Sequence, residues 1–307
     1  MAFKTFPEFS KLTLADKAEY EALIKDFPPY TDLSFPGLFI WWSLLNSLAV
    51  AELYGNLVIS YWLPGDDKTS GLAVAGTKHI DETVCNIFDY LREQDKHPRL
   101  VCVPEFVISH MRYPELFKFE EQRDQSECVF DLRAFHYPLL SANPNAKRKI
   151  KRFVGCVGVE NIKIQSLDLT VRSNRNALLN FAIAWENGGR ANKIATLEYE
   201  VLPIAVENAK DLGIKNICVY IHGTLQGFLM YQLPSDSRYV IATFFKANDR
   251  IVGFYDYMLY ACARHFSELG ITYINFEQDL GVPSLRAEKL RLGPTNFLRK
   301  YTVEPAS

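Results

Sequence analysis

Apolar and polar positions follow strand and helix periods through most of this chain, and the order of the elements they predict is its clearest feature. In the first half, the pattern predicts a strand near 9–12, helices over 15–27 and 35–45, strands over 49–54, 57–63 and 71–76, a helix over 80–94, and strands at 100–103 and 129–132. The helix over 80–94 carries Ile80, Val84, Ile87 and Leu91 at steps of four, three and four residues, so one stripe of it should be buried.

The second half repeats this order of elements without repeating its letters. The pattern predicts a strand at 162–165, helices over 172–185 and 196–212, strands over 217–222, 226–233 and 239–245, a helix over 254–269, a strand at 272–276, a helix over 283–290 and a strand over 297–303. Pro203 lies inside the second of these helices and should kink it or mark a second start. We therefore expect an α/β (α+β) protein of two similar halves, each a mixed, mostly antiparallel sheet flanked by helices.

The length and one loop-like segment suggest where the halves meet. A chain of 307 residues exceeds what one hydrophobic core usually spans. The segment 138–145 is rich in proline, asparagine and serine, which is typical of a loop. We expect an N-terminal domain over 1–135, a linker over 136–158 and a C-terminal domain over 159–307.

Composition indicates a folded protein without a strong overall charge. Hydrophobic residues make up 48% and charged residues 23%, with a formal net charge of -2, so attraction to nucleic acid or anionic membranes must come from local patches. The expected linker carries a dense basic segment that fits a tRNA or phosphate patch, or simply a solvated helix face: Lys147, Arg148, Lys149, Lys151 and Arg152. If this segment is helical, Ile150, Phe153 and Val154 should dock while the basic side chains face outward.

Cysteine spacing and hydropathy narrow the class further. The chain has six cysteines without a C-x-x-C pair, which favours reduced thiols in a cytoplasmic protein over a zinc site or a disulfide framework. Histidine spacing suggests no metal site either. No apolar segment reaches the roughly 20 residues that a bilayer-spanning helix needs. We expect a cytoplasmic protein without a transmembrane segment.

The residues best suited to chemistry lie between 274 and 303, where an apolar strand runs into acids, a glycine turn and a basic helix. Asn275, Glu277 and Asp279 are two residues apart, so on a strand they would share one face. Transfer of a group to an amine or hydroxyl needs a proton acceptor, and Glu277 or Asp279 is our candidate, with Asn275 orienting it. Asp279 could instead serve as a turn and helix cap.

Basic residues near these acids are candidates for binding a phosphate. Arg286 and Lys289 lie three apart on one helix face, which suits a phosphate or carboxylate, or a salt bridge to Glu277 or Asp279. Lys246 ends a predicted strand and could hold a phosphate or be an ordinary surface lysine.

The C-terminal run resembles the signature of the phosphatidylglycerol lysyltransferase C-terminal catalytic-domain family. The matching residues are Asn275, Glu277, Gln278, Asp279, Leu280, Gly281, Leu285, Arg286, Lys289, Pro294, Lys300 and Tyr301. The stretches at 34–41, 129–133, 146–153 and 245–248 are also similar to the family. One departure is Ser284, which stands where the family usually has glycine.

The resemblance implies two tandem GNAT-like domains and transfer of an acyl or aminoacyl group, with the donor bound in the C-terminal half. It implies aminoacyl-tRNA as donor and a phosphatidylglycerol-like lipid or a soluble amine or hydroxyl compound as acceptor, with Lys300 and Tyr301 joining Lys246, Arg286 and Lys289 in substrate or phosphate binding. One alternative is an acetyl-CoA-dependent N-acetyltransferase using Arg250 and Gly253, although Tyr255 would crowd a diphosphate there. The other alternative is a non-catalytic ligand-binding protein with this fold.

Overall fold

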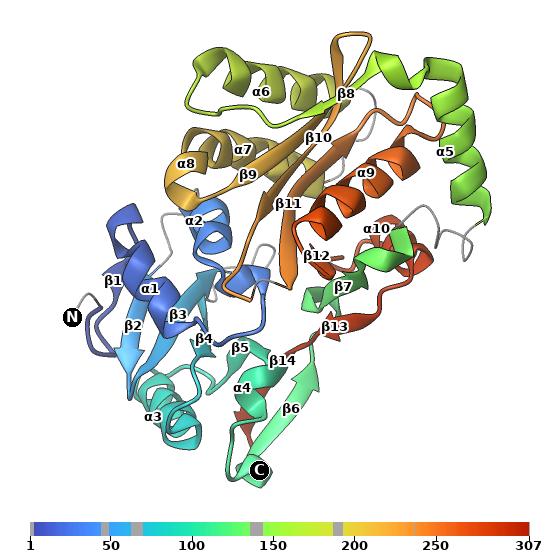
Figure 1. Cartoon of the computed structure of the whole chain (residues 1–307). Helices are drawn as coiled ribbons and strands as arrows, with labels where there is room; N and C mark the ends of the chain where they lie inside the picture. The colour runs from blue at the N-terminus through green and yellow to red at the C-terminus, as the bar shows by residue number, and fades with distance from the viewer. Residues whose placement is uncertain are drawn as a thin grey trace. The chain divides into compact units, whose positions relative to one another are not determined.

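The computed structural model describes residues 3–43, 49–62, 70–135, 144–186, 193–236 and 238–306, and the chain forms two compact units (Figure 1). Unit 1 comprises residues 1–128 and 277–307, and unit 2 comprises residues 129–276. Strands β7 (Glu127–Asp131) and β12 (Tyr273–Gln278) each cross from one unit into the other.

Unit 1 is built on a mixed sheet with strand order β1-β2-β3-β4-β5-β14-β6. Its elements are β1 (Ser10–Lys11), α1 (Lys17–Leu23), α2 (Phe35–Ser43), β2 (Ala49–Leu53), β3 (Asn56–Trp62), β4 (Ser70–Ala75), α3 (Ile80–Glu93), β5 (Leu100–Pro104), α4 (Glu105–Ile108), β6 (Phe117–Glu121), α10 (Pro283–Leu292), β13 (Asn296–Leu298) and β14 (Lys300–Pro305). The pairs are antiparallel except β4 with β5, which is parallel. The stripe predicted for α3 is confirmed, because Ile80, Val84, Ile87 and Leu91 are all buried.

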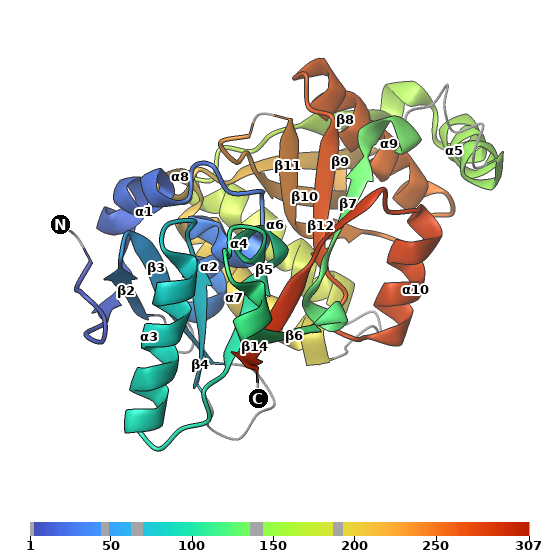
Figure 2. The same cartoon turned by 90° about the horizontal axis from the view of Figure 1, so that it is seen from below.

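The last strand of the chain completes this first sheet. β14 pairs antiparallel with both β5 and β6, with Tyr301 opposite Val103 on one side and Glu121 on the other. The red ribbon of β14 therefore lies among blue and green strands in Figure 2. Residues 277–307 thus belong to the same compact unit as the N-terminal residues, which differs from the expected C-terminal domain over 159–307.

The strands of unit 2 belong to a second mixed sheet, whose order is β13-β7-β12-β11-β10-β9-β8. The elements of unit 2 are α5 (Pro144–Val157), β8 (Ile162–Gln165), α6 (Arg172–Glu186), α7 (Lys193–Glu207), α8 (Ala209–Leu212), β9 (Lys215–Ile221), β10 (Thr224–Gln232), β11 (Tyr239–Ala247) and α9 (Phe254–Glu268). β11 and β12 are parallel and pair only from Tyr239 with Tyr273 to Ile241 with Asn275. Helix α7 continues through Pro203, so this proline does not mark a second helix start, and the separate short helix α8 begins at Ala209.

The basic segment forms helix α5, which packs against α9. Its buried residues are Ala146, Ile150 and Phe153, and the Phe153 ring lies 4.9 Å from the Tyr257 ring and 5.6 Å from the Phe254 ring between centroids. Apolar residues at these spacings give α5 one docking face, as the sequence predicted, although Val154 is only partly buried.

The α/β class expected from the sequence is confirmed, because both units have a mixed sheet flanked by helices. Within the described ranges, no helix has both the length and the apolar composition needed to cross a bilayer.

Candidate active site

Glu277 lies where β12 ends, in a backbone conformation that is rare for its residue type. Its φ is 60°, and two further residues of the following turn, Leu280 and Gly281, have φ of 52° and 71°. A non-glycine residue in this left-handed region costs of order 1–3 kcal/mol, and functional sites are among the places where such residues are found. This conformation also breaks the strand alternation, so the expectation that Asn275, Glu277 and Asp279 share one strand face does not hold: β12 ends at Gln278, before Asp279.

A buried lysine on α10 holds the main chain at this point. Lys289 is only 8% exposed, and its Nζ donates hydrogen bonds to the carbonyl oxygens of Glu277 (3.1 Å) and Gln278. The sequence placed Lys289 with Arg286 as a phosphate binder, whereas the structure directs its ammonium group at backbone carbonyls.

Asp279, by contrast, is enclosed by arginines. We call the following set the Asp279 cluster: Arg123, Asp124, Asp279, Gly281 and Arg286. Arg286 donates to both carboxylate oxygens of Asp279 at 3.0 and 2.6 Å, Arg123 Nη1 lies 3.0 Å from Oδ2, and the Gly281 N–H donates to Oδ1 at 3.1 Å. The Asp279 side chain has no exposed surface. The salt bridge and the turn contact that the sequence offered as alternatives are therefore both present.

These contacts make Asp279 a poor proton acceptor. Burial by itself raises the pKa of this carboxyl, but the hydrogen bonds from Arg286 and Gly281 and the charge of Arg123 outweigh it, and the net pKa lies below the usual value. A carboxylate with a lowered pKa that already accepts several hydrogen bonds has little tendency to take another proton. Glu277 is the better candidate of the two.

Gly281 allows the turn after β12 to pack closely against Asp124. A Cβ at Gly281 would lie 2.6 Å from the Asp124 carboxylate, and the Leu280 N–H donates to the Asp124 main-chain oxygen at 3.0 Å. The Asp124 carboxylate in turn accepts a hydrogen bond of 2.6 Å from Arg286. A side chain at position 281 would therefore meet both the unfavourable φ and the Asp124–Arg286 pair.

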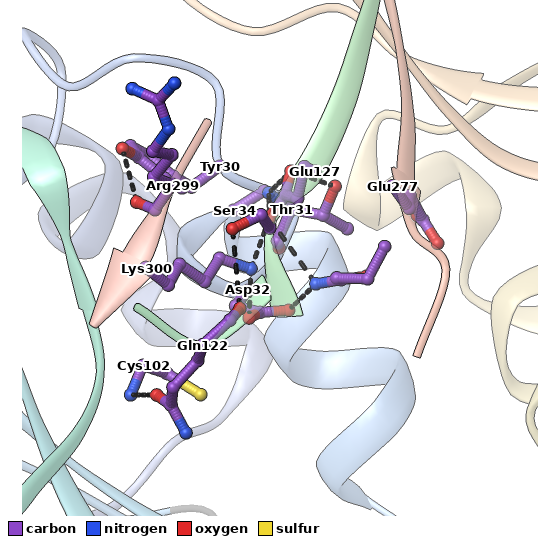
Figure 3. Close-up of polar contacts among 12 residues, drawn as sticks. Tyr30, Thr31, Asp32, Ser34, Cys102, Gln122, Glu127, Glu277, Arg299 and Lys300 are labelled. Atoms are coloured by element: carbon purple, nitrogen blue, oxygen red, sulfur yellow. Dashed lines mark hydrogen bonds and ion pairs between the residues drawn. The ribbon is translucent and has the colours of Figure 1, made fainter. Parts of the chain in front are cut away.

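A second buried set of polar residues lies beside the Asp279 cluster in unit 1, and Figure 3 shows most of it. We call the following residues the Lys300 cluster: Thr31, Asp32, Glu127, Gln278 and Lys300. Lys300 Nζ pairs with Asp32 and, at 2.6 Å, with Glu127, and Glu127 also accepts the Thr31 N–H and hydroxyl at 2.9–3.0 Å. Gln278 Nε2 donates to Asp32 at 2.6 Å. In Figure 3 the Glu277 side chain points away from this cluster.

The contacts of the Lys300 cluster connect β14 with the segments that carry Thr31, Asp32, Glu127 and Gln278. Lys300 is 1% exposed; burial lowers its pKa, but the charges of Asp32 and Glu127 more than compensate, so the net pKa is raised. The ammonium group is thus charged and paired inside the protein. Tyr301, the neighbouring residue of the signature, donates from its hydroxyl to Glu105 at 3.3 Å.

Sequence reasoning did not single out the partners of these lysines and arginines. Asp32, Glu127, Arg123 and Asp124 were not considered, although all of them contact signature residues. The available signal was the charge of Lys300 itself, since a lysine within an apolar strand pattern needs a buried acid, but the pattern does not say which acid it is.

Candidate residues in unit 2 form separate arrangements. Asn275 is fully buried in β12 and stands opposite Ile241. Lys246 is 8% exposed, pairs with Glu198 of α7 and lies 4.5 Å from the centre of the Trp185 ring. It is therefore neither an open phosphate ligand nor a surface lysine in this structure.

The start of α9 was the expected diphosphate position for acetyl-CoA. Arg250 is exposed, and Gly253 has φ of 85°. A Cβ at Gly253 would lie 2.4 Å from the Lys149 carbonyl oxygen of α5, and Lys149 Nζ lies 3.5 Å from Asp256 in the first turn of α9. A carbonyl oxygen and a carboxylate at this helix start oppose binding of a diphosphate.

The basic face of α5 is largely solvent-accessible. Arg148, Lys149, Lys151 and Arg152 are exposed and Lys147 is partly buried, while α5 contains no acidic residue. With Lys149 also paired to Asp256, the face carries a concentrated positive charge on a protein with a net charge of -2.

The fold and the signature residues define the class of this protein, and comparison with known families identifies it further. The model of the family described as "Phosphatidylglycerol lysyltransferase, C-terminal" matches residues 37–304. The chain belongs to this family, which confirms the resemblance seen in the C-terminal signature. A search of curated proteins finds no match.

Several solved structures have the same fold. A conserved protein of unknown function from Bacteroides thetaiotaomicron VPI-5482 has a TM-score of 0.83 at 21% identity, covering 97% of this chain and 99% of that chain. L-PGS from Bacillus licheniformis has a TM-score of 0.60 at 12% identity, with coverages of 94% and 92%. FemX has a TM-score of 0.59 at 10% identity, with 97% of both chains covered. At these identities the likeness concerns the fold.

Proposed function

We propose that this protein is an aminoacyltransferase that moves an aminoacyl group from aminoacyl-tRNA to a hydroxyl or amine acceptor, with Glu277 as the proton acceptor. The observation that carries the proposal is the conformation of Glu277, which has φ of 60° at the end of β12 within the signature of the phosphatidylglycerol lysyltransferase family. Strain of this kind persists only where surrounding contacts impose it. Lys289 and the Asp279 cluster supply such contacts on the residues around Glu277.

The proposed reaction needs one group to move a proton. The acceptor oxygen or nitrogen attacks the carbonyl carbon of the aminoacyl ester, and its proton passes to the Glu277 carboxylate. The bond between that carbon and the ribose oxygen of the tRNA then breaks, and the ribose oxygen takes the proton. Proton transfer of this kind typically contributes 10²–10⁴-fold to a rate, roughly.

Two considerations favour Glu277 over its neighbours in this role. The Asp279 carboxylate is occupied by Arg286 and Arg123 and has a lowered pKa. The Glu127 carboxylate is fully buried and accepts hydrogen bonds from Thr31. Glu277 as a residue is partly buried, and its Oε1 is enclosed by the protein.

An aminoacyl-tRNA donor is supported by the basic face of α5. The exposed residues Arg148, Lys151 and Arg152 could meet the phosphates of a tRNA, because lysine and arginine contacts to phosphates dominate nucleic-acid affinity. Such binding should weaken steeply as salt concentration rises. For the acceptor, the family description makes phosphatidylglycerol the first compound to test.

The test is transfer of radiolabel from a pool of aminoacyl-tRNAs to phosphatidylglycerol vesicles or to a soluble cell extract. The wild type is compared with Glu277→Gln, which keeps the size of the side chain but cannot accept the proton. Glu120→Gln, at an exposed position of β6, is the matched control. We expect wild type and Glu120→Gln to transfer label equally, and Glu277→Gln to lose at least about 100-fold in rate.

The two arms of the assay identify the acceptor class, and the variant tests the site. Label in the lipid fraction would assign a lipid acceptor, and label in the soluble fraction an amine or hydroxyl compound. Label that stays on tRNA in every arm would reject the aminoacyltransferase. Equal transfer by wild type and Glu277→Gln would reject Glu277 as the proton acceptor.

A further inference from the structure

Lys289 of α10 contacts the carbonyl groups of two consecutive residues, Glu277 and Gln278. Its Nζ donates to the Glu277 carbonyl oxygen at 3.1 Å and to the Gln278 carbonyl oxygen. Lys289 is 8% exposed, whereas the next basic residue of the helix, Arg291, has a 44% exposed side chain and pairs with Glu288 on the surface.

The position of these hydrogen bonds matters because of the strain next to them. A left-handed Glu277 turns its carbonyl group out of the direction that a regular strand would give it, so the oxygen needs a donor other than a neighbouring strand. A buried ammonium group supplies up to three donors. Without it, two carbonyl oxygens would lose a charge-assisted hydrogen bond, and a relaxed backbone would become more favourable.

We propose that Lys289 is a positioning residue, which holds Glu277 in its left-handed conformation through its hydrogen bonds to the Glu277 and Gln278 carbonyl oxygens. This inference rests on the proposed function in so far as Glu277 is the proton acceptor. It replaces phosphate binding by Lys289 with a role that acts through Glu277.

Burial and neighbouring groups act on Lys289 in opposite directions. Burial lowers its pKa, and this effect outweighs that of Cys128, Glu277, Asp279 and Glu127, so the net pKa lies below the usual value for lysine. The Asp279 charge is already balanced by Arg286 and Arg123, and Glu127 is paired with Lys300. Lys289 acts on residue 277 through the hydrogen bonds from its Nζ to the Glu277 and Gln278 carbonyl oxygens.

The test compares Lys289→Met, which removes charge and donors, with Lys289→Arg, which keeps both. Arg291→Met is the matched control, because it removes a positive charge from the surface of the same helix. Aminoacyl transfer is measured as kcat and KM from pH 5 to 8.5. For Lys289→Met we expect kcat to fall about 100-fold with KM little changed, as for a displaced catalytic group.

The change in kcat against KM and the rescue by arginine separate positioning from a merely structural role. The kcat should fall in Lys289→Met, stay close to wild type in Lys289→Arg, and remain unchanged in Arg291→Met. A Lys289→Met enzyme with unchanged kcat would overturn the inference, as would an equal loss of kcat in Arg291→Met.

A structural readout keeps this test separate from the test of the function. A crystal structure of Lys289→Met, or of Lys289→Arg if the first variant does not fold, reports φ at residue 277 whether or not transfer is observed. A negative φ in Lys289→Met with a positive φ in Lys289→Arg supports positioning even if no tRNA-dependent transfer is found. A positive φ retained in Lys289→Met, or lost in Lys289→Arg, overturns it.

Discussion

Replacing Asp279 by asparagine should destabilise unit 1 rather than only stop catalysis. The wild-type carboxylate is unexposed and accepts hydrogen bonds of 2.6–3.1 Å from Arg286 and Gly281, and Arg123 lies 3.0 Å away. Asparagine has the same shape, but it loses the negative charge and turns an N–H₂ group toward an arginine. Removing one partner of a buried ion pair costs about 3–5 kcal/mol, so we expect a loss of about 3 kcal/mol in the free energy of unfolding.

Asp124→Asn is the control for this prediction. Asp124 contacts the same arginine at 2.6 Å, but its side chain is 60% exposed, and an exposed pair contributes at most about 1 kcal/mol. Urea denaturation followed by circular dichroism measures both variants. Equal losses for the two variants, or a loss below about 1 kcal/mol for Asp279→Asn, would refute the view that the buried carboxylate organises this turn.

The stability contributed by the Asp279 charge should also depend on pH, in a direction set by the lowered pKa of Asp279. The pKa of Asp279 is lowered in the folded protein, so its charge contributes stability above the unfolded pKa of about 3.9, and that stability is lost as pH falls through the folded pKa. The difference between wild type and Asp279→Asn should therefore be constant from about pH 5 to 8 and shrink below about pH 4.

Two further variants test the packing of α5 and the Lys300 cluster. Gly253→Ala combines an unfavourable φ with a Cβ 2.4 Å from the Lys149 carbonyl oxygen, which should loosen the packing of α5. Trypsin should therefore cleave α5 faster in this variant than in the control Gly223→Ala, where φ is 77° and no atom lies near the added Cβ. Equal cleavage of the two variants would contradict this prediction. Lys300→Met leaves Glu127 buried beside another acid and should cost about 4 kcal/mol in urea denaturation. Because the pKa of Lys300 is raised, its contribution is complete below about pH 10 and is lost only at higher pH, so this cost should be the same at pH 6 and 9.

The candidate site was only partly predictable. The segment around Glu277 was identified from its mixture of acids, glycine and basic residues, and Gly281 follows from the need for a left-handed residue in a tight turn. The sequence did not show which of Glu277 and Asp279 is the candidate proton acceptor and which is paired with arginines. Glu277 and Asp279 look equivalent in sequence, and only the positions of Arg123 and Arg286 show that Asp279 is enclosed while Glu277 is not part of that cluster.

The elements of the fold were determined by the sequence itself. β8, α6 and α9 begin within one residue of their predicted starts, because burial of one face produces a period of two in strands and 3.6 in helices, roughly, that is visible locally. The repeated order of elements likewise predicted two mixed sheets, because a given order of strands and helices can be arranged in only a few ways that cover both faces of a sheet.

Which segments complete each sheet was decided only by the tertiary structure. β14 has the apolar alternation of any half-buried strand. This local pattern does not tell whether the strand lies at the edge of the second sheet or between β5 and β6 in the first sheet, where the structure places it. This placement brings Lys300 into contact with Asp32, which is 300 − 32 = 268 residues away in the sequence, and with Glu127, which is 300 − 127 = 173 residues away. The buried charges, the strain at Glu277 and the lysine beneath it depend on contacts between such distant segments, so they follow from how the chain packs and not from any local pattern.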